Sequence, residues 1–423
     1  MTVLVKVASL GKELIVAWRF GTGDELDAFF IAWLVPSLLI VVLADSFNGA
    51  LIPVFIRVRE QEGLQSAQKL FSSVVVLSLV ILVTMSILMV LTAPIYLPLI
   101  AQGFSLKKLA LTKQILIAIA PIVPLSGITV IWGAVLNAEE RFAGAALAPI
   151  ITPIISIFFL FFYNQLSIFA LPLGFVCGSI IEVTFLGIAL RKQGFSVLPK
   201  WHGFEQHLRY CAKQYLPTLA GSSLMFSATI VDQSMAALLS PGSVSALNYG
   251  TKLISLPINL TATALSVAVI PYFSKMVADR QWFELRITLK RYLLFIFVTT
   301  VPLTILCIIF SQQLVEFLLQ KGAFSSADSQ LVSRIQVLYA LQIPFYVAAT
   351  LLVQALVSMG LNYVLIWAAG LNLLINIQLN YIFLNWLGVE GIALSTSCVN
   401  AFSFGFVLLC LKFNLSKTEN ESR

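Results

Sequence analysis

The chain has 423 residues, of which 59% are hydrophobic and only 11% charged, with a net charge of +7. A soluble domain carries about 25% charged residues, so this chain cannot cover a soluble surface. Apolar stretches of about 20 residues, long enough to cross a bilayer, recur along the chain, and the mean hydropathy is +0.95. The basic residues lie in short loops between these stretches, which argues for membrane topology and against nucleic-acid binding.

The apolar stretches predict an all-α polytopic membrane protein with about twelve transmembrane helices, because lipid gives backbone groups no hydrogen-bond partners. The predicted spans are 2–20, 27–56, 68–97, 111–136, 143–163, 167–190, 212–239, 243–273, 289–318, 331–358, 362–384 and 389–412. With a cytoplasmic N-terminus, most basic residues fall in cytoplasmic loops, and the outer loops hold Lys107, Lys108, Lys113 and Lys321. This bias predicts that both termini are cytoplasmic.

Similar landmarks recur in the two halves of the chain. The paired segments are 27–30 with 245–248, 52–55 with 270–273, and 103–105 with 322–325. A helix with a central proline, Pro124 or Pro344, follows in each half. Chance likeness among apolar helices is the alternative, but the shared order favours two parallel six-helix repeats. Two such bundles suit alternating access, with a substrate site between them.

The repeat predicts four parts of the chain. These are an N-terminal six-helix lobe at 1–190, a cytoplasmic linker at 191–211, a C-terminal six-helix lobe at 212–412 and a cytoplasmic tail at 413–423.

The first predicted helix carries four charges, Lys6, Lys12, Glu13 and Arg19. Ionisable groups inside a membrane are costly unless they face a cavity or a partner. Lys6 and Glu13 are two helical turns apart, as are Lys12 and Arg19, so the four form one broad polar face. Snorkelling to the cytoplasmic surface explains Lys6, but Lys12 should lie about 15 Å into the span.

Further charges lie on the second and eighth predicted helices. Asp27 and Asp45 belong to the second helix and Lys252 to the eighth. Convergence of Lys252 with Lys6 and Lys12 would form a cationic cavity suited to a phosphate or pyrophosphate. Alternatively, the lysines neutralise Glu13, Asp45 or Asp27 in buried pairs.

A second group of polar residues lies in the C-terminal half. Asp232 is in the middle of a predicted helix, Asn376 and Asn380 share one face of the eleventh, and Thr396 is on the twelfth. These are hard oxygen ligands of the kind that Na⁺ accepts. Hydrogen bonding between helices is the alternative. The chain has no GxxxxGK[ST] loop, no HExxH and no nucleophile elbow, so we expect neither ATP hydrolysis nor another enzyme activity.

Several motifs together resemble one known family. They comprise Gly21-Thr22-Gly23, the stretch 26–32, Pro36 and 52–55, then 242–247 with Tyr249, Lys252 and Pro257, and the loop 322–328. Across essentially the whole chain, this set resembles the MurJ/MviN lipid II flippases. That family belongs to the multidrug/oligosaccharidyl-lipid/polysaccharide exporter superfamily.

The resemblance implies a V-shaped bundle of two six-helix lobes. It assigns the family's cavity basic positions to Lys6, Lys12 and Lys252 and an acidic position to Asp27. The family favours arginine at the basic positions, and lysine lacks the bidentate fork for pyrophosphate. A further family arginine aligns with Ile40. The resemblance also implies a sodium site at Asp232, Asn376, Asn380 and Thr396, in which Asn380 replaces an aspartate.

The predicted function is therefore that of a monomeric flippase in the bacterial cytoplasmic (inner) membrane. Its cargo would be an undecaprenyl-pyrophosphate-linked glycan, by default lipid II for peptidoglycan synthesis, and its only cofactor Na⁺ as a coupling ion. The alternatives are an exopolysaccharide or O-antigen flippase, a cation-coupled drug antiporter of the same superfamily, and a non-transporting scaffold. A drug antiporter would need an acidic cavity, whereas this one is predicted to be basic.

Overall fold

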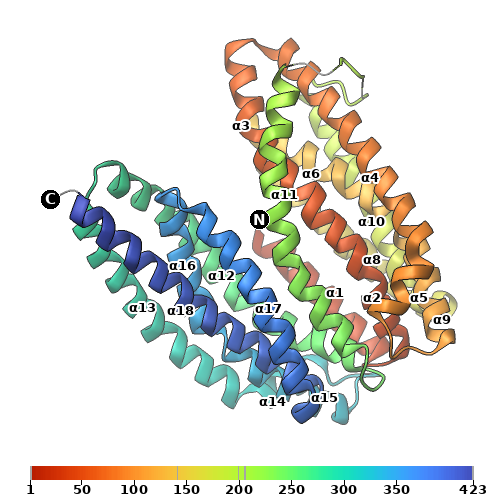
Figure 1. Ribbon diagram of the computed structural model, residues 1–423. Helices are drawn as coiled ribbons and strands as arrows, with labels where there is room; N and C mark the ends of the chain where they lie inside the picture. Colours follow the sequence, from red (N-terminus) through yellow and green to blue (C-terminus); the bar gives the residue numbers. More distant parts are fainter. Residues whose placement is uncertain (1, 141, 199, 204–205, 422–423) are drawn as a thin grey trace. The chain divides into compact units, whose positions relative to one another are not determined.

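The computed structural model describes residues 2–140, 142–198, 200–203 and 206–421, and within these ranges the chain is helical, with no β-strand (Figure 1). Eight of the described helices are long and apolar enough to cross a membrane, or nine if α15 (Ser326–Ala340) and α16 (Ile343–Ser358) form one bent span. The predicted all-helical, multi-pass fold is confirmed. The count of twelve spans and the layout as two repeats stay predictions.

The chain divides into two compact units, Met1–Phe226 with Lys321–Phe324, and Ser227–Gln320 with Ser325–Arg423. The first unit contains α1 (Thr2–Phe20), α2 (Asp24–Leu39), η1 (Ile40–Ala44), α3 (Asp45–Gln61), α4 (Leu64–Ile100), α5 (Leu106–Ile119), α6 (Ile122–Ala138), α7 (Phe142–Leu147), η2 (Ala148–Ile150), α8 (Ile151–Phe161), α9 (Tyr163–Leu166), η3 (Ser167–Phe169) and α10 (Ala170–Lys192). Helix α11 (Gln206–Ala236) begins in this unit and ends in the second.

Several predicted helices of the first unit are interrupted, and the span predicted at 143–163, for example, contains the 3-10 segment η2. The span predicted at 27–56 contains a π-helical segment, η1, that begins at Ile40, shortly after Pro36. Proline removes a backbone donor, and π segments often lie at functional sites. The span predicted at 111–136 breaks between α5 and α6 at Pro121, whereas Pro124 lies within α6.

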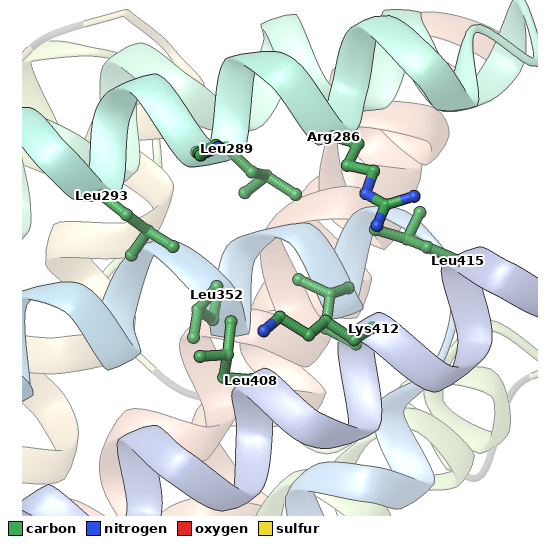
Figure 2. Close-up of a pocket in the computed structure, with 9 residues that line it drawn as sticks. Arg286, Leu289, Leu293, Leu352, Leu408, Lys412 and Leu415 are labelled. Atoms are coloured by element: carbon green, nitrogen blue, oxygen red, sulfur yellow. The ribbon is translucent and has the colours of Figure 1, made fainter.

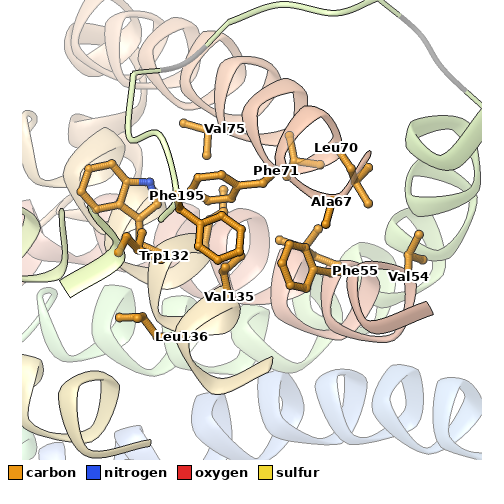
Figure 3. Close-up of a cluster of buried hydrophobic side chains, with 14 of the residues drawn as sticks. Val54, Phe55, Ala67, Leu70, Phe71, Val75, Trp132, Val135, Leu136 and Phe195 are labelled. Atoms are coloured by element: carbon orange, nitrogen blue, oxygen red, sulfur yellow. The ribbon is translucent and has the colours of Figure 1, made fainter. Parts of the chain in front are cut away.

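The core of the first unit lies between α3, α4 and α6 (Figure 3). Phe195, which follows α10, inserts into this cluster, with ring centroids 6.0 Å from both Phe55 and Phe71. The side-chain amide of Gln68 on α4 donates to the carbonyl of Ser196 at 3.0 Å and accepts from its N–H at 2.9 Å. After the end of α10 at Lys192, residues 193–198 of the predicted linker therefore form a non-helical segment fixed to the core.

Helices α8 and α10 pack closely because both present small residues. A Cβ atom on Gly174 would lie 2.7 Å from the Cα of Ser156, and one on Gly178 would lie 2.7 Å from the Cα of Thr152. Glycines four apart are a common contact in membranes, where backbones approach closely without a hydrophobic driving force.

Residues 321–324 belong to the first unit although they come late in the chain. The N–H of Ala323 donates to the carbonyl of Trp18 at 2.8 Å. Gly21 has φ of +57° and Gly322 of +62°, and a Cβ on Gly21 would collide with the carbonyl of Ala323. Both glycines are needed for this contact.

The second unit contains α12 (Ser243–Ala278), α13 (Trp282–Ile309), α14 (Ser311–Leu319), α15, α16, α17 (Asn362–Leu387) and α18 (Val389–Glu421). Its core is formed by apolar side chains of α12, α13, α16, α17 and α18, and α17 and α18 run side by side (Figure 1). Helix α18 continues to Glu421, beyond the predicted end at residue 412. Ser105 and Ser325 end the paired segments 103–105 and 322–325, and each accepts a hydrogen bond from the N–H three residues later, at the start of α5 or α15.

We predict that Gly178→Ala lowers stability by about 1–3 kcal/mol, because the new Cβ meets the backbone of α8. The measurement is thermal unfolding of the purified protein in detergent. Gly133→Ala on α6 is the matched control, since nothing lies within 4 Å of its Cβ position. Equal shifts in the two variants would show that the α8–α10 contact is not the cause.

Candidate functional site

The charges of α1 lie in two different environments. The ammonium of Lys12 contacts the Glu13 carboxylate at 2.9 Å, with the side chains 12% and 15% exposed. Lys6 is exposed. Lys12 and Glu13 therefore form the ion pair that was one of the two alternatives. Both remain partly open, so the pair is not sealed inside the unit.

Lys12 also lies over an aromatic platform. Its ammonium is 4.6 Å from the ring centroid of Phe175 on α10. That ring stacks on Trp33 and Phe29 of α2, with centroid distances of 5.3 Å and 6.0 Å. A cation over an aromatic face is stabilised electrostatically, so Phe175 and Glu13 together hold a positive charge inside the first unit.

Asp27 lies away from Lys12 in a separate ion cluster. The ammonium of Lys108, on the first turn of α5, contacts Asp24 at 2.6 Å and Asp27 at 3.0 Å, and lies 3.9 Å from the ring centroid of Phe104. Asp27 is 1% exposed and Asp24 59% exposed. From its position in the sequence Lys108 was predicted to be an outer-loop charge, and this role in an ion cluster was not predicted. A signal was available, because Ser105 marks the start of α5 and so places Lys108 on its first turn.

For two of the predicted substrate-binding residues, the structure gives less information about the surroundings of the side chain. Asp45 begins α3, but its side chain lies outside the described part of the structure. Lys252 is half-buried on α12 in the second unit. The convergence of Lys252 with Lys6 and Lys12 stays a prediction.

The four residues of the predicted cation site do come together, within the second unit. Asp232 on α11 accepts hydrogen bonds from the side-chain amides of Asn376 at 3.0 Å and Asn380 at 2.6 Å, both on α17. The hydroxyl of Thr396 on α18 donates to its other carboxylate oxygen at 3.3 Å. Asn376 is 2% exposed and Asn380 fully buried. One carboxylate is thus enclosed by three neutral polar side chains from two other helices.

The amide oxygens matter for what this cluster can bind. The Oδ1 atom of Asn380 is buried and has no hydrogen-bond partner in the described structure. An amide flip exchanges its oxygen and nitrogen at nearly the same positions. Turned in this way, Asn376 and Asn380 would present oxygens beside the Asp232 carboxylate and the Thr396 hydroxyl. The donor set therefore fits a hard monovalent cation, with a single negative charge.

Glu182 of α10 accepts a hydrogen bond from the hydroxyl of Thr152 at 2.9 Å. It lies one helical turn after Gly178, on the same face toward α8. The bond satisfies a half-buried carboxylate and adds a polar contact between α8 and α10.

The fold is similar to that of solved membrane transporters. An inward-facing MATE-family multidrug transporter of the MOP superfamily matches with a TM-score of 0.83 and 15% identity, covering 100% of this chain and 96% of that one. At this identity the likeness concerns the fold alone.

The family follows from the sequence. The model of the lipid II flippase MurJ family matches residues 16–422, and the chain belongs to that family. A solved lipid II flippase MurJ in an inward closed conformation is 27% identical, with a TM-score of 0.82 over 97% of this chain and 86% of that one. Probable lipid II flippases MurJ from Synechocystis sp. and Helicobacter pylori are 24% and 26% identical, covering 98% and 93% of this chain and 80% and 89% of theirs.

We predict that Asp27→Asn destabilises the protein by about 3 kcal/mol or more, because it removes the buried partner of Lys108. Asp24→Asn, at the exposed end of the same cluster, should change stability by about 1 kcal/mol or less. Thermal unfolding of both variants and of Asp27→Asn/Lys108→Met checks this. The double variant should regain part of the loss, and no recovery would contradict the assignment of Lys108 as the buried partner.

Proposed function

We propose that the protein is a flippase that moves lipid II across the membrane and not an enzyme. The observation that carries this proposal is the family match, which extends over residues 16–422. The 27% identical solved MurJ supports the same cargo. Family membership favours lipid II over an exopolysaccharide unit, an O-antigen unit or a drug.

The pyrophosphate of the cargo would bind at the lysines of α1 and α12. The contacts of Lys12 support this role, since Glu13 and Phe175 hold its ammonium while leaving it partly exposed. Phosphate oxygens would compete with Glu13 for the ammonium, and charge-assisted hydrogen bonds are the strong ones. Lys252 would supply a second cation, and Lys6 would supply a positive charge that attracts the pyrophosphate as it enters. Asp27 and Asp45 complete the proposed set, Asp27 acting in gating through its bond to Lys108.

The proposed setting is the cytoplasmic (inner) membrane of a bacterium, with a monomeric protein and both termini in the cytoplasm. The excess of basic residues in the corresponding loops supports this orientation. The proposed moving parts are the two lobes, 1–190 and 212–412. The linker 191–211 would join them, and the tail 413–423 would follow the second lobe.

Sodium is the proposed coupling ion. Asp232, Asn376, Asn380 and Thr396 would hold it, and the unpartnered Oδ1 of Asn380 supports a role beyond hydrogen bonding. A bound cation would supply the positive charge that balances Asp232. The residues themselves tie α11, α17 and α18 together, so occupancy would tighten these helices against one another.

We predict that the wild-type gene rescues cells depleted of their lipid II flippase, whereas Lys12→Ala and Lys252→Ala do not. Each lost cation should lower transport in reconstituted vesicles about tenfold or more. Lys107→Ala, at an exposed position, is the matched control. Failure of the well-expressed wild type to rescue would reject the lipid II function. Rescue by both lysine variants would reject only their role in binding.

We predict that NaCl raises the melting temperature of the wild type by a few degrees over choline chloride at the same ionic strength. Asp232→Asn should abolish the difference, because the site then has no negative charge. Asn380→Asp should enlarge it, since a second carboxylate strengthens a cation site. An equal sodium effect in wild type and Asp232→Asn would exclude this site.

A further inference from the structure

A leucine-lined pocket of 390 Å³ opens in the second unit between α13, α16 and α18 (Figure 2). Its nine lining residues are six leucines, two lysines and one arginine, so no acidic side chain lines it. Ligand pockets are commonly about 300–1,000 Å³, mostly apolar, with a few convergent polar groups. The volume and lining therefore suit a ligand that is largely apolar and carries a negative charge.

The two long helices present the same arrangement to the pocket. On α13 the lining positions are 286, 289, 290 and 293, and on α18 they are 408, 411, 412 and 415. Each set follows the i, i+3, i+4, i+7 spacing of one helix face. Each places a lysine, Lys290 or Lys412, at the third of its four positions. Two facing stripes of leucine thus carry three cations, Arg286 and Lys290 on α13 and Lys412 on α18.

The depth of burial separates an apolar floor from a charged mouth. Leu352 of α16 is 0% exposed, and Leu289 and Leu411 are 4% and 2% exposed. Lys290 and Lys412 are exposed. Figure 2 shows the charged end of Lys412 turned into the opening among the leucines. Apolar walls lower the local dielectric, which strengthens the attraction of these cations for an anion.

The surroundings of the mouth are apolar, which argues for a lipid over a free anion. Leu294 beside the α13 stripe is 66% exposed, and Leu409 and Phe413 beside the α18 stripe are 67% and 71% exposed. In a multi-pass membrane protein such side chains face lipid. Lys290 lies within the first three turns of α13 and Lys412 within the last three turns of α18. From this position near the helix ends we infer that both cations reach the headgroup region. Basic pockets between helices at this depth bind anionic headgroups.

We propose that this pocket binds an anionic phospholipid of the leaflet on the side of the C-terminus. The phosphate binds between Lys290 and Lys412, and an acyl chain lies along Leu289, Leu352 and Leu411. The site is separate from the lysines of α1 and α12 and from the Asp232 cluster. It joins α13 to α18 through a shared ligand, so its lipid stabilises the second unit.

The test uses the delipidated full-length protein and native mass spectrometry, with phosphatidylglycerol and phosphatidylcholine of identical chains. We expect phosphatidylglycerol to bind and to raise the melting temperature, and phosphatidylcholine to do neither. Lys290→Gln/Lys412→Gln should weaken phosphatidylglycerol about tenfold or more. Lys275→Gln/Arg291→Gln removes the same charge from exposed positions outside the pocket and should leave binding unchanged.

A pocket-filling variant and a competition experiment test the proposal further. Leu408→Trp fills the pocket without removing charge and should also weaken phosphatidylglycerol. Inorganic phosphate and glycerol phosphate should not displace the lipid. Equal losses in the two charge-removed variants, undiminished binding in Leu408→Trp, or displacement by inorganic phosphate would each overturn the proposal.

Discussion

A polar group that enters the hydrocarbon of a bilayer must find its partner within the protein, because lipid can neither donate nor accept a hydrogen bond. In this chain that constraint determines which helices meet. Lys108 joins α5 to α2 through two carboxylates, Glu182 joins α10 to α8, and Asp232 joins α11 to α17 and α18. The few charged groups thus serve as fixed points between helices whose apolar surfaces are otherwise interchangeable.

Close approach between helix backbones is the second feature that determines which helices pack together. Lipid tails are as apolar as leucine, so burying leucine against leucine gives little preference for one helix over another. The glycines of α10 admit the backbone of α8, and Phe195 fills the space between α3, α4 and α6. A further close contact, the aromatic stack of Phe29, Trp33 and Phe175, joins α2 to α10 and holds Lys12.

The sequence was sufficient for the helical, multi-pass fold and for the grouping of Asp232 with Asn376, Asn380 and Thr396. Those residues follow helical periodicity and one family's spacing. The ion pair of Lys108 with Asp27 could not be predicted from the sequence, because the two residues are distant in the chain. The position of Lys108 in a predicted loop instead indicated a role in membrane topology. Pairing of Lys12 with Glu13 was one of two alternatives, and helical spacing could not decide for it, because adjacent helical residues do not normally face each other. The π-helical segment at Ile40 and the insertion of Phe195 arise from tertiary packing and leave no periodic trace.

The hydrogen bond between Ala323 and Trp18 affects the order in which the two units can complete their folding during synthesis. Translation proceeds from the N-terminus, and early parts of a chain generally begin to fold first. The first unit nevertheless includes residues 321–324, which leave the ribosome only after the segment Ser227–Gln320 of the second unit. Its Trp18 carbonyl acquires its partner only then. The two halves are therefore not sequential, independent products of synthesis, and the first reaches its final state only when much of the second already exists.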